Sequence, residues 1–166
     1  MPNAIDICST GGSGLPRINT STLTAFILAA LDVEIAKHGN RAASGRFGSF
    51  DFLESIGINI TPSNEHLHFL FFKTNLAFCF APDFHSVVGS FSAARKKVGF
   101  PTSFNLIGPL LNPANVEKQL IGVSYKECME TVLKTAIGQG KKHVVVVRGQ
   151  DGLDEITITG KTDILE

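Results

Sequence analysis

The chain has 166 residues, the length of one ordinary domain. Its 15 basic and 15 acidic side chains give a formal net charge of zero, which argues against a nucleic-acid binder because such proteins usually carry a basic excess. Hydrophobic residues make up 43% and charged residues 18%, a composition that excludes a disordered chain. Since no apolar run approaches the ~18 residues of a membrane span and residues 1–3 lead straight into a predicted strand, we expect neither a membrane span nor a signal peptide. We expect one domain over 1–166, located in the cytoplasm.

The three cysteines, Cys8, Cys79 and Cys128, are far apart in the sequence. An odd, scattered set predicts neither a disulfide framework nor a CxxC metal pair. We expect three small, buried apolar side chains that stay reduced in the cytosol.

In the first part of the chain, a strand-length apolar run leads into a helical pattern. Residues 5–8 predict a short strand that enters the glycine-rich turn 9–14, and residues 19–22 offer several helix N-caps. The inward face of the helix is predicted from four apolar residues at helical spacing: Leu23, Phe26, Ile27 and Ala30.

A second strand and two helices are predicted next. The strand covers 33–36 and is closed by the polar turn 37–41, and the helices cover 48–55 and 64–74. One face of the last helix is expected to carry Leu67, Leu70 and Phe71.

The second half of the chain continues this alternation. Helices are predicted over 84–97 and 126–137, and the stretch 101–113, rich in Pro, Gly and Asn, predicts an irregular loop. The strand patterns cover 76–80, 120–123, 143–147 and 155–158.

Strands that alternate with helices predict an α/β fold, with a mainly parallel sheet flanked by helices. Ligands bind such sheets at the carboxyl ends of the strands. The turns 9–14 and 37–41 both follow predicted strands, so we expect them to lie on one rim and to form a single site.

The glycine turn 9–14 has the features of an anion site. Glycines let backbone N–H groups approach an anion, and the helix N-terminus that follows adds unpaired donors. The hydroxyls of Ser21 and Thr22 can cap the helix or hold phosphate oxygens. The turn is neither GxGxxG nor a P-loop, because no Lys follows its last glycine. An ordinary strand-to-helix turn is the alternative interpretation, and the local pattern does not separate the two.

The turn 37–41, Lys-His-Gly-Asn-Arg, is dense in hydrogen-bond donors. Its Lys is a point-charge partner for phosphate and its Asn can bond a carbonyl or a hydroxyl. A solvated turn is the alternative interpretation.

Three other groups of charged side chains carry candidate chemistry. Asp154 and Glu155 are adjacent carboxylates that suit Mg²⁺, which takes one or two carboxylates plus substrate phosphates. Arg95 lies beside two lysines and could receive an anionic carboxylate, and His85 stands at a predicted helix start. The alternative for Asp154 and Glu155 is an ordinary acidic surface turn. The alternatives for Arg95 and His85 are a solvated helix face and a helix-capping or packing His.

The order and spacing of these segments resemble those of the anthranilate phosphoribosyltransferase family. The matching segments lie between residues 6 and 155 and read STGGSG-x4-NTST, KHGNR, GSFDFLE, APDFH, ARKKVGFPTSFNLIGPLLNP and GLDE. The resemblance implies a catalytic domain of the nucleoside phosphorylase/phosphoribosyltransferase-like type. It also implies the transfer of a phosphoribosyl group from phosphoribosyl pyrophosphate to the amino group of anthranilate, with Mg²⁺, in tryptophan biosynthesis.

The resemblance further implies the roles of individual residues. Asn40 is expected between the two substrates and Arg95 at the anthranilate carboxylate, with His85 and Pro109 near its ring. The metal ligands are expected to be Ser21, Asp154 and Glu155. The pyrophosphate and ribose site is expected to include Gly11, Gly12, Asn19, Ser21, Thr22, Lys37 and Ser49, and the remaining substrate-binding positions are Ser13, Arg17, His38 and Gly39. No catalytic base is assigned, because an arylamine is already a nucleophile and positioning can carry the reaction.

Three residues depart from the family pattern. The family turn usually reads GTGGDG, whereas this chain has Ser9 and Ser13, and Arg17 stands where Thr or Ser is usual. Ser13 removes a carboxylate from the phosphate and metal site, and Ser9 adds a side chain where the backbone approaches the substrates. Arg17 either binds phosphate directly or blocks the pocket.

Length is a fourth departure from the family. Family members are longer, with a helical region before the glycine turn and more sheet and helix after the GLDE segment. We therefore expect the central α/β portion of the fold, an incomplete domain. The homodimer of the full-length family has no support in this chain's own sequence.

Two other functions remain open. A pyrimidine nucleoside phosphorylase shares the fold and a TGG turn, but KHGNR and NLIGPLLNP favour the transferase. A degenerate family member would bind phosphate ligands, nucleic acid or another protein without catalysis. Ser9, Ser13 and the short chain favour that second alternative, while the zero net charge argues against nucleic acid.

Overall fold

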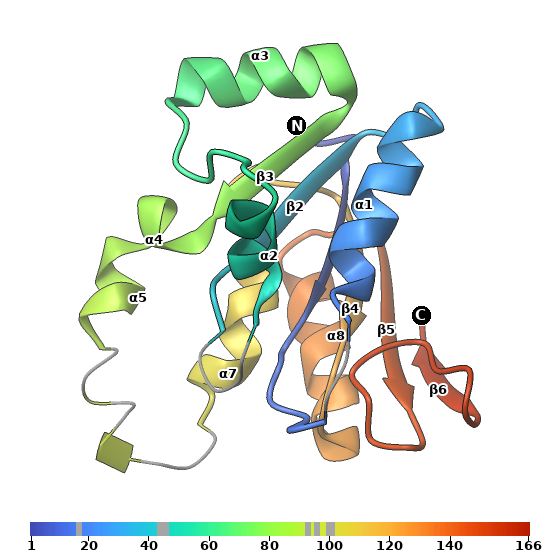
Figure 1. Ribbon diagram of the computed structural model, residues 1–166. Helices are drawn as coiled ribbons and strands as arrows, with labels where there is room; N and C mark the ends of the chain where they lie inside the picture. Colours follow the sequence, from blue (N-terminus) through green and yellow to red (C-terminus); the bar gives the residue numbers. More distant parts are fainter. Residues whose placement is uncertain (16–17, 43–46, 92–93, 95–96, 99–101) are drawn as a thin grey trace.

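The computed structural model describes the whole chain except residues 16–17, 43–46, 92–93, 95–96 and 99–101 (Figure 1). In this described part, six strands form one sheet in the order β3-β2-β1-β4-β5-β6. Their bounds are β1 Ile5–Ser9, β2 Ile35–Gly39, β3 Leu76–Phe80, β4 Lys118–Gly122, β5 His143–Gly149 and β6 Thr162–Leu165. Strands β1 to β5 are parallel to one another, and only the edge strand β6, which pairs with β5, is antiparallel in this described sheet. The predicted mainly parallel α/β sheet is confirmed.

Helices connect the strands and flank the sheet. Before β4 they are α1 Thr20–Ala30, α2 Ser49–Ser55, α3 Asn64–Thr74, α4 Ala81–Phe84, α5 Ser86–Ser90, α7 Phe104–Ile107 and the 3-10 turn η1 Gly108–Leu111. Between β4 and β5 lie the 3-10 turn η2 Lys126–Cys128 and α8 Met129–Gly138.

The two faces of the sheet have separate cores because side chains alternate along each strand. On one face, Ala25 of α1 packs on Ile7 and Ile35. On the opposite face, α8 packs Val132 and Ala136 against a cluster that includes Cys8 and Ile121. Both cores end at the carboxyl rim of the sheet, where the glycine turn follows β1 and Asn40 follows β2. The prediction that these two turns share one rim is confirmed, because β1 and β2 are parallel.

The predicted inward face of α1 was wrong for Leu23, Ile27 and Ala30, which are exposed, whereas the predicted Phe26 is partly buried and packs against Phe78. The buried residues are Thr22, Ala25 and Ala29, whereas Leu23 is 40% and Ile27 is 60% exposed. Helix α1 lies against the sheet through small side chains, which allow its backbone to approach closely. Helical spacing could not select this face, because large apolar residues occur on more than one side of the helix.

Four other boundaries differ from the predictions. Strand β2 continues through Lys37, His38 and Gly39, so the predicted turn 37–41 is mostly strand. The predicted helix 84–97 breaks at His85, whose φ of −130° and ψ of 57° are not helical. The predicted loop 101–113 contains α7 and η1, and the predicted strand 155–158 is a loop that precedes β6.

The three cysteines are free; Cys8 and Cys79 are buried, as predicted, whereas Cys128 is only partly buried, so the prediction of burial was wrong for it. Burial raises the pKa of the Cys8 thiol well above its usual range and that of Cys79 to about 12. Both thiols are therefore held in the unreactive protonated form. Among the residues described, no helix is long and apolar enough to cross a membrane.

Candidate active site

The glycine turn after β1 has a backbone that only glycine adopts without strain. Gly11, Gly12 and Gly14 have φ values of 67°, 86° and 69°, a region that L side chains rarely occupy. Apart from the chain neighbours, no atom of the described residues lies within 4 Å of the position that a Cβ would take at any of the three. Glycine is therefore required here by the backbone angle rather than by crowding, and the turn presents main-chain groups at its surface.

The turn is anchored to the segment that follows β4. The Thr10 N–H donates to the Gly122 carbonyl at 2.9 Å. The Ser124 hydroxyl donates to the Gly11 carbonyl at 2.5 Å, and the Ser124 N–H donates to Thr10 Oγ1 at 3.2 Å. The Arg148 guanidinium of β5 donates in turn to the Ser124 carbonyl at 3.1 Å. Neighbouring strands thus fix the position of the turn.

The buried lysine of β2 lies beside the N-terminus of α1. Lys37 is 2% exposed, and its Nζ donates to the Ile7 carbonyl at 2.5 Å and to Ser21 Oγ at 3.0 Å. Burial lowers the pKa of Lys37, and the charges of Asp6 and Glu155, among others, act in the opposite direction. Lys37 Nζ thus joins the end of β1 to the first turn of α1, next to the glycine turn.

The start of α1 carries the other predicted phosphate residues. Asn19 is the N-cap residue, but its side chain makes no capping hydrogen bond. Thr22 is fully buried, and its hydroxyl has no hydrogen-bond partner in the described part of the chain. A ligand at this helix start would meet the partly exposed Asn19 and Ser21, because the Thr22 hydroxyl is closed off from the surface.

On the opposite face of the sheet, His38 begins a second cluster. Its ring lies edge-on to that of His85, with centroids 5.1 Å apart. Burial lowers the pKa of His38 from 6.5 to about 4, although Asp6 and a hydrogen bond to the Gly108 backbone oppose the shift. Pro109, next to Gly108, is buried. Because strand side chains alternate, Lys37 and His38 point to opposite faces, and the predicted single site has two parts at one rim.

Asn40 and Ser49 lie next to one another between these parts. The Ser49 hydroxyl donates to the Asn40 carbonyl at 3.2 Å, and the Asn40 side-chain oxygen accepts from the Arg41 N–H at 2.8 Å. Gly39 permits this approach, since a Cβ there would lie 2.8 Å from Ser49 Oγ.

The acidic turn after β5 reaches the glycine turn directly. Asp154 is 1% exposed, and its Oδ2 accepts from the Gly11 N–H at 3.0 Å. Among the residues described, no group of three or more His, Cys, Asp or Glu side chains could hold a metal by itself. Asp154, Glu155 and the Ser21 hydroxyl supply oxygen atoms only. This donor set fits Mg²⁺, which binds through one or two carboxylates together with substrate phosphates rather than in an all-protein cage.

Two predicted residues, Arg17 and Arg95, lie outside the described residues. The other predicted positions lie in the last three residues of β2, after the carboxyl ends of β1, β2 and β5, at the start of α1 and α2, or in the segments around His85 and Pro109. Sequence reasoning missed the buried polar residues that support them. Asp6 accepts from the His38 N–H at 3.1 Å and from Gln119 Nε2 at 3.1 Å, and Gln119 also donates to the Pro109 carbonyl at 2.8 Å. A charged residue inside an apolar strand was the signal that could have identified Asp6.

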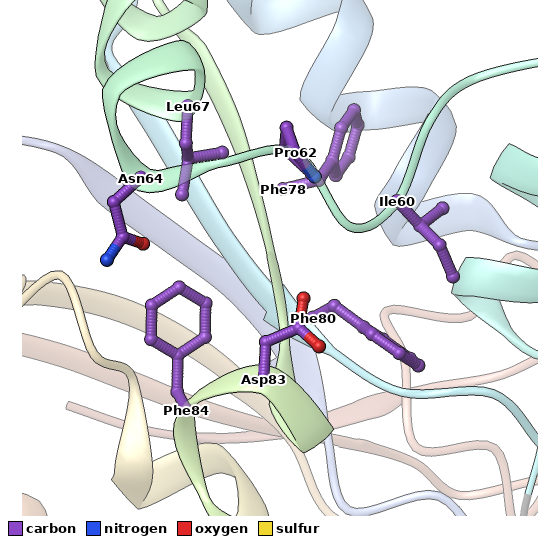
Figure 2. A pocket seen from close by; sticks show the side chains of 8 residues that line it. All are labelled: Ile60, Pro62, Asn64, Leu67, Phe78, Phe80, Asp83 and Phe84. Carbon is purple, nitrogen blue, oxygen red and sulfur yellow. The ribbon is translucent and has the colours of Figure 1, made fainter.

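Two small cavities lie away from this cluster. One, of about 80 Å³, is enclosed by α3, β3 and α4 (Figure 2). Its lining residues are Ile60, Pro62, Asn64, Leu67, Phe78, Phe80, Asp83 and Phe84. It is much smaller than the roughly 300–1,000 Å³ of typical ligand sites, and it offers no basic group to a phosphate. The second cavity has a volume of about 220 Å³ and lies near His143, at the amino end of β5. The glycine turn lies at the other end of the strands, at their carboxyl rim.

Fold and site together define an α/β domain of the glycosyl transferase type. The model of the family described as "Glycosyl transferase family, a/b domain" matches residues 1–166, and the chain belongs to this family. Its relatives within the family are anthranilate phosphoribosyltransferases. The protein of that name from Geobacillus stearothermophilus is 45% identical over 99% of this chain and 48% of its own length.

Solved structures give the same result. Anthranilate phosphoribosyltransferase from Thermus thermophilus superimposes with a TM-score of 0.89 and 35% identity, over 99% of this chain and 49% of that one. The Saccharomyces cerevisiae enzyme in complex with PRPP and Mg has a TM-score of 0.82 and 31% identity, over 100% of this chain and 49% of that one. The chain spans about half the length of these relatives.

Proposed function

We propose that this chain carries the phosphoribosyl pyrophosphate and Mg²⁺ subsites of an anthranilate phosphoribosyltransferase, which transfers the phosphoribosyl group to the amino group of anthranilate and releases pyrophosphate. The observation that carries the proposal is the convergence of the glycine turn, Ser21, Lys37 and Asp154 at one rim of the sheet. We infer small-molecule substrates and a location in the cytoplasm, the compartment of amino-acid biosynthesis.

The pyrophosphate side is formed by main-chain and cationic donors. Gly11 and Gly12 present a backbone turn without side chains, and the N-terminus of α1 adds N–H groups and a partial positive charge. Lys37 contributes a fixed ammonium group, held by Ser21 and by the Ile7 carbonyl. Such a preorganised set stabilises the charge that grows on a departing pyrophosphate. Asn19, Ser13 and Thr22 complete the proposed set.

The acceptor side lies around His38, His85 and Pro109, with Arg95 as the proposed partner of the anthranilate carboxylate. Burial keeps His38 neutral at physiological pH, since its pKa is lowered to about 4. A neutral ring beside the His85 ring suits contact with an aromatic acceptor better than a charged imidazolium does. Asn40, Gly39 and Ser49 lie between the two parts and are proposed to contact both substrates.

The chemistry agrees with this inventory. Displacement at the anomeric carbon passes through an oxocarbenium-like state, by analogy with glycosyl transfer. The arylamine is already nucleophilic, so the chain's residues act by positioning the two substrates rather than as a strong base. Mg²⁺, when bound at Asp154, Glu155 and Ser21, supplies charge neutralisation to the pyrophosphate.

The departures in the glycine turn are expected to weaken turnover more than binding. Ser13 provides no carboxylate for the metal, while the glycines, Ser21 and Lys37 are retained. We propose that Arg17 compensates in part by attracting the pyrophosphate. A charged hydrogen bond contributes roughly 1.5–3 kcal/mol, so Arg17→Ala should weaken binding about tenfold or more.

The test combines binding with turnover. Calorimetry should detect weak, Mg²⁺-dependent binding of phosphoribosyl pyrophosphate, and the loss of anthranilate fluorescence should report transfer. Asp154→Asn should lower Mg²⁺-dependent binding by roughly 10–100-fold, because the amide is a poor Mg²⁺ ligand. Asp32→Asn is the matched control. It makes the same chemical change just beyond the C-terminal end of α1, where Asn also tolerates the positive φ of 61°.

The outcomes separate the alternatives. Binding without transfer would favour a degenerate member, and phosphate-dependent cleavage of a pyrimidine nucleoside would favour the phosphorylase. No heat at millimolar phosphoribosyl pyrophosphate, with the protein folded, would overturn the proposal.

A further inference from the structure

Ser124 links the glycine turn to the acidic turn, although it belongs to neither. It follows β4, is 8% exposed, and donates its hydroxyl to the Gly11 carbonyl at 2.5 Å. The N–H of the same glycine donates to Asp154 Oδ2 at 3.0 Å. Only one residue, Gly11, therefore stands between the Ser124 hydroxyl and a buried carboxylate proposed to bind metal.

We propose that Ser124 is a positioning residue for metal binding, which acts by fixing Gly11 so that its N–H holds the Asp154 carboxylate toward the Mg²⁺ site. This inference rests on the proposed function, which gives Mg²⁺ as the metal and Asp154 as one of its ligands. Carboxylates that bind metals are commonly oriented by a hydrogen bond from a neighbouring donor. Here that donor is a backbone N–H, whose direction depends on how the turn is anchored.

The anchoring of Ser124 is itself well defined. Its carbonyl accepts from the Arg148 guanidinium at 3.1 Å, and its N–H donates to Thr10 Oγ1 at 3.2 Å. Two of the three residues after Gly11 are also glycines with positive φ, Gly12 and Gly14, so the turn has few side chains of its own to hold it. The Ser124 hydroxyl is thus the shorter of two partly buried contacts on the Gly11 carbonyl, which also accepts from Thr10 Oγ1 at 3.2 Å.

The Asp154 backbone is fixed independently of the turn. A Cβ on Gly122 would overlap the Asp154 carbonyl oxygen, so the two backbones are in close contact. Loss of the Ser124 hydroxyl should therefore leave the acidic turn in place and change mainly the direction of the Gly11 N–H. The carboxylate would then be less well oriented for a metal ion.

The first experiment uses Mn²⁺ alone as the probe, and follows the paramagnetic broadening of the Gly11 amide resonance by NMR. Wild type should show saturable broadening, and Ser124→Ala should need roughly three- to tenfold more Mn²⁺. Ser124→Thr keeps the hydroxyl and should stay within about twofold of wild type. Ser55→Ala is the matched control, because it removes an exposed hydroxyl-to-carbonyl bond of 2.7 Å, to Phe52 in α2.

The second experiment separates positioning from a general structural role. Phosphoribosyl pyrophosphate is titrated at limiting and at saturating Mg²⁺. Ser124→Ala should raise the Mg²⁺ needed for half-maximal binding by roughly three- to tenfold, yet change the affinity at saturating Mg²⁺ by less than about twofold. A merely structural defect would lower both affinities equally, and that result would overturn the inference.

Two further results would also overturn it: no Mn²⁺ broadening of Gly11 in wild type, or identical Mn²⁺ titrations for wild type and Ser124→Ala. A folded wild type that binds Mn²⁺ but no phosphoribosyl pyrophosphate would reject the proposed function instead. The Mn²⁺ titrations would still decide the role of Ser124.

Discussion

At the scale of single residues, Lys37 and His38 are neighbours in β2 whose side chains are both buried but differ in their hydrogen-bond partners. Lys37 keeps two hydrogen-bond acceptors for its ammonium group, the Ile7 carbonyl and Ser21 Oγ. His38 faces the other side of the sheet, and its Nε2 has no hydrogen-bond partner among the residues described. An imidazolium at that position would be poorly solvated, which is why the pKa of His38 falls to about 4.

This burial predicts acid sensitivity. The unfolded chain binds a proton at His38 near pH 6.5, whereas the folded chain does so near pH 4. The unfolded state is therefore favoured progressively as the pH falls from 6.5 to 4, by about 3 kcal/mol in total. His38→Gln should remove this part of the pH dependence, measured as the free energy of unfolding in urea across that range.

The control for this experiment is His66→Gln, at an exposed position in α3. It should retain the pH dependence of the wild type. The measured quantity is the slope of the free energy of unfolding against pH. A constant loss of stability, caused by the loss of the hydrogen bond to Gly108, does not change that slope. An unchanged slope in His38→Gln would contradict the prediction.

At the scale of elements, close backbone contacts determine the arrangement of the site. Helix α1 approaches the sheet through Ala25 and Ala29, and β4 approaches the acidic turn at Gly122. In both places a small residue lets two backbones meet. The elements that carry the phosphate and metal residues are therefore fixed by residues that have no functional group.

Gly122→Ala tests this element contact. The added Cβ would overlap the Asp154 carbonyl oxygen and would also approach Ser9 Cβ, so the acidic turn must shift. We expect a loss of about 1–3 kcal/mol in the free energy of unfolding, typical of overpacking, together with weaker Mg²⁺-dependent binding. Denaturant titration and calorimetry would measure the two effects.

Gly138→Ala is the matched substitution. Gly138 is the last residue of α8, and no atom lies within 4 Å of its Cβ position. The change should stabilise the protein by roughly 0.4–1 kcal/mol, because alanine restricts the unfolded chain. Equal destabilisation by the two substitutions would show that the Gly122 contact is not the cause.

At the scale of the whole molecule, the carboxyl rim collects polar groups from segments far apart in the chain. Gly11 and Asp154 are 143 positions apart, and Ser124 and Gly11 are 113 apart. A ligand that binds across these segments stabilises the entire fold, since unfolding would separate all of them.

Ligand-linked stability is the corresponding prediction. Phosphoribosyl pyrophosphate at about 100 times its Kd, with Mg²⁺, should add about 2.7 kcal/mol of stability. For a chain of this length, that corresponds to a rise in Tm of roughly 5–10 °C in calorimetric scans. The same concentration of ribose 5-phosphate, which lacks the pyrophosphate, should give a clearly smaller rise. Equal rises would show that the pyrophosphate elements do not contribute.

The sequence by itself determined the elements whose signals are local. Helix α3 matches the predicted 64–74, because Ser63 caps its start and Asn75 ends it in the left-handed region. Strand β3 matches the predicted 76–80, an apolar run of strand length. The mainly parallel arrangement of the strands and the rim shared by the two turns followed from the alternation of strands and helices. The family was identified from motifs spread over most of the chain. Each of these inferences depends on neighbours in sequence or on a fixed spacing.

Only the tertiary structure decided which side of α1 is buried, that Lys37 and His38 serve opposite faces, and that Ser124 reaches Gly11. It also revealed Asp6 beneath His38 and the break in the helix at His85. The face of α1, the Ser124 contact and the place of Asp6 depend on packing or hydrogen bonds between segments that the fold brings together, and the spacing of apolar residues does not contain that information.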